Sequence, residues 1–254
     1  MPKNLDNRIR LYWEKADTQS MKDQYLKKLE AKLIDSHITE NDRVLDLGCG
    51  DGTGSQLYRR RCRWYVGFDR SARMLREFSR REPDTPLILG DIQSLPFGNT
   101  TRKFTVIITQ RSLINLPDRT AQKLALRRIS RILRPGNRLI LCEAFQEGFA
   151  RLNELRSYLG SQPIKELWHN IYLDRKLTAG ELSGIMHLEK EEDLSCYYFL
   201  TRVVHQALVG EAVPQWNSPI NRIAFEIAKS GKAPDFKGFS TIMLQIWRKK
   251  KEVN

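Results

Sequence analysis

The segment Val44–Gly54, VLDLGCGDGTG, joins a short apolar run to four glycines at alternate positions. Such a run, followed at once by a glycine-rich loop, predicts a buried strand that turns tightly into a helix. Glycine suits this turn because it tolerates positive φ angles and lets a ligand approach without Cβ atoms in the way. The loop by itself fits any dinucleotide or nucleoside cofactor.

Apolar runs and helical segments alternate after this loop. We expect strands at residues 64–69, 87–91, 104–109 and 138–143, besides the one at 43–47. We expect helices at residues 5–37, from Ser71 onward and at 118–133, where apolar residues recur at helical spacing. Strands that are apolar throughout and separated by helices predict an α/β fold, with a parallel sheet covered on both faces.

Acidic residues close the second and third expected strands. Asp69 lies 19 residues beyond Gly50, a spacing typical of a carboxylate that accepts hydrogen bonds from ribose hydroxyls. Asp91 ends the third strand, where a carboxylate can accept from an adenine amino group. A nicotinamide-dependent dehydrogenase is the competing interpretation, but it gives no role to the segment around Asp91.

Taken together, these segments resemble the class I S-adenosylmethionine-dependent methyltransferases. The resemblance rests on Val44–Gly54, Val66–Asp69 (VGFD), Gly90–Phe97 (GDIQSLPF) and Leu133–Gly136 (LRPG), and it covers about residues 40–145. It implies a Rossmann-like seven-stranded sheet, methyl transfer as the activity and S-adenosyl-L-methionine as the cofactor. The residues we expect to bind that cofactor are Asp46, Gly48, Gly50, Asp69, Arg70, Met74, Asp91, Ile92 and Gln110.

The charge is distributed unevenly. The net charge is +13, of which residues 1–142 carry +12 and residues 143–254 carry +1. The basic half is either a footprint for RNA or another polyanion or a set of solvated helix faces. Base-stacking aromatic residues are missing from these basic stretches, which favours the second interpretation. No Asn/Asp-Pro-Pro-Tyr tetrapeptide follows the fourth strand, which counts against methylation of a nucleic-acid base amine.

The second half is longer than a minimal methyltransferase requires. We expect the last two strands at residues 186–194 and 241–248, with about 45 residues inserted between them. The predicted organisation within one domain (1–254) is an N-terminal helical lid at 1–38, a cofactor-binding core at 39–145, substrate cap elements at 146–240, and a final strand with a basic tail at 241–254. A near-neutral, aromatic-rich cap predicts a discrete small-molecule acceptor.

Polar and aromatic residues after the fourth expected strand and in the second half are the candidates for catalysis and for binding the acceptor. His169 is the candidate general base, with a packed structural histidine as the alternative. Arg111 suits a carboxylate or phosphate on the acceptor, and a surface arginine is the alternative. No metal site is expected. The residues we expect to contact the acceptor are Arg111, Asn115, Glu143, Trp168, Asn170, Tyr172, Tyr198 and Arg202.

These features predict a methyltransferase acting on a hydroxyl or amine of a metabolite, sugar or natural-product intermediate. The alternatives are a methyltransferase acting on RNA or protein, and a cofactor-binding protein without catalysis. No apolar run reaches the ~20 residues that a membrane span needs, and residues 1–4 lack a signal-peptide core. We therefore expect a cytoplasmic location and no membrane partner; the oligomeric state is left open.

Overall fold

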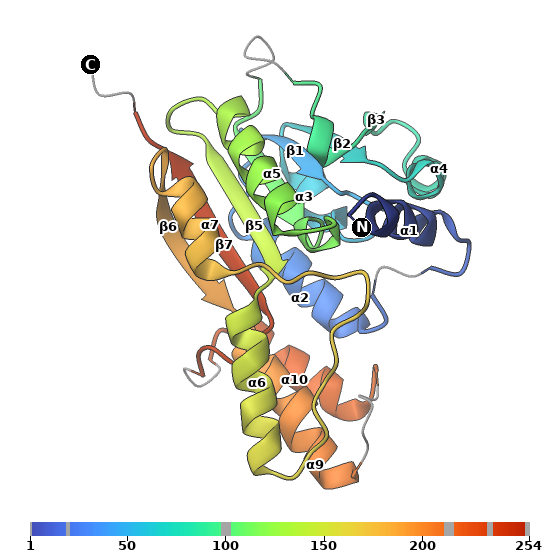
Figure 1. The fold of residues 1–254 in the computed structure, drawn as a ribbon, viewed down its shortest axis with the longest axis vertical. Helices are drawn as coiled ribbons and strands as arrows, with labels where there is room; N and C mark the ends of the chain where they lie inside the picture. Colours follow the sequence, from blue (N-terminus) through green and yellow to red (C-terminus); the bar gives the residue numbers. More distant parts are fainter. Residues whose placement is uncertain (1, 19–20, 98–102, 211–215, 233–235, 252–254) are drawn as a thin grey trace.

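The computed structural model describes residues 2–18, 21–97, 103–210, 216–232 and 236–251. Its centre is a seven-stranded sheet with the order β3-β2-β1-β4-β5-β7-β6 (Figure 1). β7 runs antiparallel to both of its neighbours, β5 and β6. This sheet and its helices confirm the predicted fold class. The strands are β1 (Arg43–Leu47), β2 (Trp64–Asp69), β3 (Leu87–Leu89), β4 (Val106–Gln110), β5 (Arg138–Ala144), β6 (Met186–Asp193) and β7 (Ile242–Lys249).

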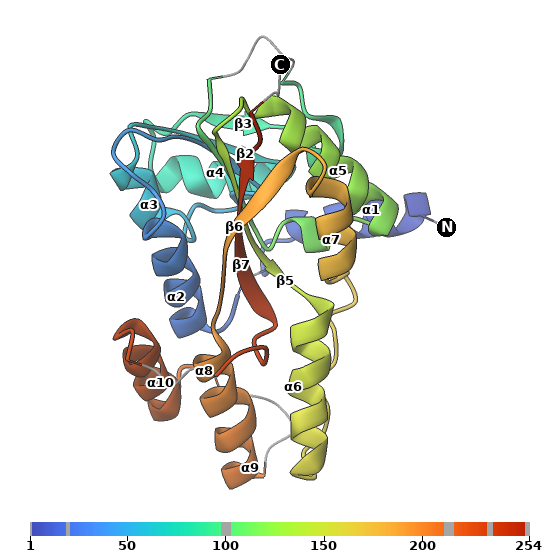
Figure 2. The same cartoon turned by 90° about the vertical axis from the view of Figure 1, so that its left-hand side faces the viewer.

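Helices cover both faces of the sheet (Figure 2). One side carries α2 (Gln24–Asp35), α3 (Gln56–Arg61) and α4 (Ala72–Arg81), and the other carries α5 (Arg119–Ile132) and α7 (Arg175–Leu182). Successive side chains of a strand point to opposite faces. On β4, Val106 and Ile108 accordingly join the apolar cluster under α2, whereas Ile107 joins the cluster under α5. The continuous apolar strands are explained by burial on both faces.

The N-terminal region forms two helices instead of the single helical stretch expected at 5–37. α1 spans Pro2–Glu14 and α2 begins at Gln24. Asp23 ends the interruption, because its carboxylate accepts a hydrogen bond from the Leu26 N–H at 3.0 Å and caps α2. Helical spacing of apolar residues continues across both segments, so it could not reveal the break.

The remaining helices form a cap beyond the carboxyl ends of the strands (Figure 1). α6 (Gln146–Tyr158) follows β5; α8 (Ser195–Tyr198), the π-helical turn η4 (Phe199–Val204), α9 (His205–Val209) and α10 (Pro219–Lys229) lie between β6 and β7. Within the described ranges, no helix is both long and apolar enough to cross a bilayer. Residues 252–254 of the predicted basic tail lie outside the described residues.

Candidate active site

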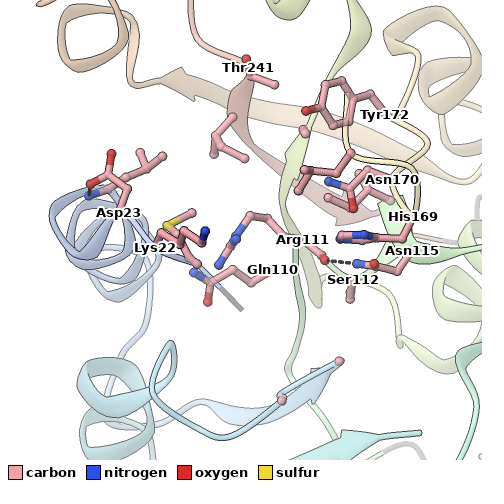
Figure 3. A pocket seen from close by; sticks show the side chains of 18 of the residues that line it. Lys22, Asp23, Gln110, Arg111, Ser112, Asn115, His169, Asn170, Tyr172 and Thr241 are labelled. Carbon is pink, nitrogen blue, oxygen red and sulfur yellow. Dashed lines mark hydrogen bonds between the residues drawn. The ribbon is translucent and has the colours of Figure 1, made fainter. Parts of the chain in front are cut away.

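A cavity of about 920 Å³ lies between the carboxyl ends of the strands and the cap (Figure 3). Parallel sheets bind ligands at this edge, beside the point where the strand order reverses, here between β1 and β4. Its volume is near the upper end of the range for ligand pockets, roughly 300–1,000 Å³. The predicted site residues that line it are Gly48, Gly50, Asp69, Arg70, Met74, Asp91, Ile92, Gln110, Arg111, Asn115, His169, Asn170, Tyr172, Tyr198 and Arg202.

The glycine loop forms one wall of the cavity. Gly48 has φ +82°, and a Cβ there would lie 2.3 Å from Cβ of Ser112, so only glycine fits. Gly50 has φ +55°, but no atom lies within 4 Å of the place where its Cβ would be. The chain therefore leaves open space directly above the loop, which suits a close approach of a ligand to the backbone.

Asp69 is held in a fixed orientation at the end of β2. Its two carboxylate oxygens accept hydrogen bonds at 2.8 Å, one from the Gly50 N–H and the other from the Ser71 N–H. Each oxygen keeps a further lone pair for a ligand hydroxyl. Burial raises the pKa of Asp69, while the two backbone donors lower it. This arrangement fits the ribose of a nucleoside cofactor.

The next strand brings an acceptor and an apolar surface to the same wall. Asp91 caps a short 3-10 turn, η1 (Ile92–Ser94), by accepting from the Gln93 N–H at 2.8 Å. α1 covers this end of the cavity, since Asp6 accepts from Arg70 Nη1 at 2.8 Å. Beside Ile92, these polar groups fit an adenine ring with an exocyclic amine. Asp69, Asp91 and the open glycine loop together fit the cofactor that the resemblance implies.

Asp46 lies behind the glycine loop and does not line the cavity, which differs from our prediction. It is buried, and its Oδ2 accepts from the hydroxyls of Tyr58 at 2.9 Å and Tyr65 at 2.7 Å. Burial raises the pKa of Asp46 to about 6. The tyrosine hydroxyls draw this carboxylate toward the core side of β1. Asp46 therefore supports the strand that carries the loop and does not contact a ligand there.

The segment after β4 combines backbone strain with a buried ion pair. Arg111 adopts φ +50°, in the left-handed region, and its carbonyl accepts from Asn115 Nδ2 at 2.8 Å (Figure 3). Glu30 of α2 is fully buried and accepts from Gln110 Nε2 at 2.8 Å and from Arg111 Nε at 3.1 Å. Burial raises the pKa of Glu30. Glu30 could not be predicted from the sequence, because nothing in a helix pattern marks one inward-facing acid.

Glu143 also differs from its predicted role. It is fully buried at the end of β5 and does not line the cavity. Its Oε1 accepts from the N–H groups of Ser112 and Leu113, each at 3.1 Å. Burial raises the pKa of Glu143 to about 6. The carboxyl satisfies the unpaired donors at the start of a 3-10 turn, η3 (Leu113–Asn115), so it positions the loop and does not face an acceptor.

His169 lies in an aromatic cluster that closes the cavity opposite the glycine loop. Its ring stacks on Tyr12 of α1 with centroids 4.4 Å apart, and its side chain lines the cavity. Its Nδ1 is buried without a hydrogen-bond partner, and burial lowers the pKa of His169 below 6.5. Trp168 differs from our prediction, since it is 48% exposed, makes a T-shaped ring contact with Tyr12 and does not line the cavity.

The cap supplies the remaining wall. Asn170 and Tyr172 lie beside His169 (Figure 3). Tyr198 and Arg202 come from the helices after β6. Asp23, which pairs with Arg202, and Trp216 are among the lining residues that were not predicted as site residues. A polar residue before an apolar helical run signals an N-cap, so the sequence could have marked Asp23 as a cap but not as an ion-pair partner.

The comparisons with known proteins define the class to which this fold and site belong. Residues 44–136 match the family model described as "Methyltransferase domain". Residues 44–136 are therefore similar to a methyltransferase domain, as the resemblance implied. The match ends before β5, so it does not extend to the cap.

Individual relatives agree with this class. Demethylmenaquinone methyltransferase of Paenarthrobacter aurescens (strain TC1) is 30% identical over 138 residues, 54% of this chain and 46% of that protein. The chain thus spans less than half the length of the curated relatives that it matches.

Solved structures share the fold over most of the chain. N-methyltransferase NodS from Bradyrhizobium japonicum WM9, in complex with S-adenosyl-L-homocysteine, has a TM-score of 0.60 at 13% identity, over 98% of this chain and all of that one. The [4+2]-cyclase SpnF has a TM-score of 0.55 at 17% identity, over 88% of this chain and 81% of its own. The likeness to both shows that the fold alone does not specify the reaction.

Proposed function

We propose that this protein transfers a methyl group from S-adenosylmethionine to a hydroxyl or amine of a small molecule. The observation that carries this proposal is the continuous cavity of about 920 Å³, which runs from the glycine loop to the cap. The residues suited to the nucleoside follow β1, β2 and β3, whereas the cap residues follow β5 and β6 at the other side of the sheet. Such a cavity holds donor and acceptor side by side.

The chain contributes alignment and exclusion of water. The bound cofactor supplies an electrophilic methyl group on a sulfonium, so displacement needs an acceptor held in line with that group. Asp69 and Asp91 orient the nucleoside, and the glycine loop lets it lie against the backbone. α1 closes the cavity from outside, since the Ser71 hydroxyl donates to the Trp13 carbonyl at 3.1 Å and Trp13 Nε1 donates to Asn115 at 3.2 Å.

His169 is the group that can take a proton from an acceptor hydroxyl. A lowered pKa keeps its imidazole neutral at pH 7, and its buried Nδ1 is without a hydrogen-bond partner. In the tautomer with the proton on Nε2, Nδ1 accepts the hydroxyl proton as the oxygen–methyl bond forms. A neutral amine acceptor needs no such base before methyl transfer.

Ion pairs count against the alternative acceptors, RNA or protein. Arg59 and Arg60 both pair with Glu82, at 2.6 and 3.3 Å. Arg81 pairs with Asp51 at 2.9 Å. An arginine whose charge is balanced by a carboxylate releases fewer counterions on binding a polyanion. Part of the positive charge of the first half is therefore held in ion pairs within the fold, which weakens the argument for a nucleic-acid footprint.

Methyl-labelled S-adenosylmethionine and fractionated cell extract test the proposal directly. Label should enter the small-molecule fraction in the presence of the protein, and the Asp69→Ala variant should give only background. Label that becomes soluble on RNase or protease treatment would favour the macromolecular alternative. No transfer to any fraction, with intact cofactor binding, would favour a cofactor-binding role without methyl transfer.

A further inference from the structure

The far end of the cavity contains a buried arginine. Arg202 lies on η4, which follows the edge strand β6. Asp69 and Asp91 lie toward the opposite edge of the sheet, at the end of β2 and after β3. Arg202 is 4% exposed, lines the cavity and lies 4.5 Å beneath the ring centroid of Trp216. Its position places it among cap residues, away from the residues suited to the nucleoside.

One edge of the Arg202 guanidinium is already fixed. Its Nη2 donates to Oδ2 of Asp23, which is itself buried. The other oxygen of Asp23 accepts from the Tyr197 hydroxyl at 2.8 Å and from the Leu26 N–H at 3.0 Å. In contrast, Nη1 of Arg202 is buried and has no hydrogen-bond partner. A buried donor of this kind carries a desolvation penalty unless a ligand satisfies it.

A second buried arginine leaves this region with a surplus of positive charge. Arg156 is fully buried, and its Nε donates to the Gln162 carbonyl at 3.0 Å, with Nη1 donating to the Arg202 carbonyl and to Gln206. Among the described residues, no carboxylate lies within ion-pair distance of Arg156. Burial and the neighbouring charge of Arg202 lower the pKa of Arg156. Asp23 therefore pairs with Arg202, and no described carboxylate pairs with Arg156.

We propose that this end of the cavity binds a carboxylate on the methyl acceptor, with Nη1 of Arg202 as its donor. The inference rests on the proposed function and narrows its substrate class to monocarboxylic acids with an aromatic or apolar body. A carboxylate supplies the hydrogen-bond acceptor that Nη1 of Arg202 lacks. Trp216, Tyr198, Phe149 and Leu152 line the space around it and suit an apolar body.

Paired probes that differ only in charge test this site. Isothermal titration of the full chain saturated with S-adenosyl-L-homocysteine would compare 4-hydroxybenzoate, 4-hydroxyphenylacetate and octanoate, each with its primary amide. We expect at least one acid to bind about tenfold more tightly than its amide, as a charge-assisted hydrogen bond contributes this much. The inference is overturned if every acid binds within threefold of its amide.

Variants separate the arginine from a general effect on folding. The double variant Arg202→Gln with Asp23→Asn removes both charges at once and keeps a capping side chain at position 23. It should lose the preference for the acid, whereas Arg202→Lys should keep part of it. Arg127→Gln is the matched control, since Arg127 is an exposed arginine paired with Glu181 outside the cavity. A preference that survives in the double variant would contradict our assignment.

The cofactor titration keeps this inference distinct from the proposed function. If the wild-type protein binds S-adenosyl-L-homocysteine but no acid preferentially, the carboxylate site alone is refuted. If it binds no S-adenosyl-L-homocysteine, the proposed function fails, and the acid and amide comparison is run on the protein alone. An acid preference that needs Arg202 would then still support the site.

Discussion

The buried carboxyl of Asp46 should make the protein less stable as the pH rises, and the Asp46→Asn substitution should remove this contribution. Burial raises the pKa of Asp46 from its ordinary 3.8 to about 6 in the folded protein. Below pH 3.8 the carboxyl is protonated in both states and costs the fold nothing. As the pH rises from 3.8 to about 6, the unfolded state ionises while the folded state stays protonated, so this carboxyl lowers the stability with rising pH until the folded state ionises as well.

The size of the effect follows from the difference between the two pKa values. A tenfold change in protonation equilibrium is worth about 1.36 kcal/mol, so full ionisation costs the folded state about 3 kcal/mol. Roughly 2 kcal/mol of this falls between pH 4 and pH 7. The amide that Asp46→Asn introduces does not titrate, yet its oxygen can still accept from Tyr58 and Tyr65. The variant should therefore gain about 2 kcal/mol relative to wild type over that interval.

Urea unfolding at pH 4, 5, 6 and 7 measures this difference, whatever fixed cost the new amide adds. Asp84→Asn is the control, since Asp84 is exposed and its substitution should leave the pH profile of wild type in place. A difference between Asp46→Asn and wild type that stays constant within about 0.5 kcal/mol from pH 4 to pH 7 would refute this account. Glu143, whose pKa burial also raises to about 6, contributes a separate fall in both proteins.

Three further substitutions test the site. Asp69→Ala should weaken the binding of S-adenosyl-L-homocysteine about 100-fold in calorimetry, because two charge-assisted hydrogen bonds to the ligand are lost. The circular dichroism spectrum should be unchanged. An unchanged affinity would mean that Asp69 does not bind the ribose. His169→Phe keeps the stacking on Tyr12 but should lower turnover at least ~10²-fold if the acceptor is a hydroxyl. In the wild-type protein, the acid limb of the pH profile of kcat should lie below pH 6.5. A loss of turnover of only a few-fold would mean that His169 has a packing role alone. Glu30→Ala should lower the free energy of unfolding by about 3 kcal/mol and Tm by roughly 6–12 °C, because it removes the buried carboxylate that pairs with Arg111. A loss under about 1 kcal/mol in urea unfolding would show that Arg111 is solvated without Glu30.

The cavity wall at the glycine loop was predictable because it is built from the backbone. Positive φ at Gly48 and Gly50 and an acid at a strand end each require particular residue types at particular spacings, and these are visible in a sequence. The strands were predictable for a similar reason, since burial on both faces demands continuous apolar runs. Only their ends moved: the expected 87–91 strand ends at Leu89, and the expected 104–109 strand begins at Val106.

The acids show where residue type alone misleads. Asp46, Glu143 and Asp69 all stand at or near a strand end, yet only Asp69 lines the cavity. Position along a strand does not say whether tyrosine hydroxyls, as at Asp46, or loop N–H groups, as at Glu143, take up the carboxylate. That choice depends on neighbours distant in sequence. Glu30 is the converse case, an acid in a helix that tertiary packing brings to Gln110.

The cap could be expected as an insertion but not in its charge, and that charge is where acceptor specificity can reside. Residues 143–254 are near neutral as a sum, which predicted a neutral wall. In the folded protein, the acidic and basic residues of this segment lie in different places. Most of the acids lie on other surfaces, whereas Arg156 and Arg202 are buried together. The net charge is a sum over the whole segment, whereas a bound ligand contacts only the few charged groups that are buried around it. The local imbalance around Asp23 therefore says more about the acceptor than the charge of the whole segment.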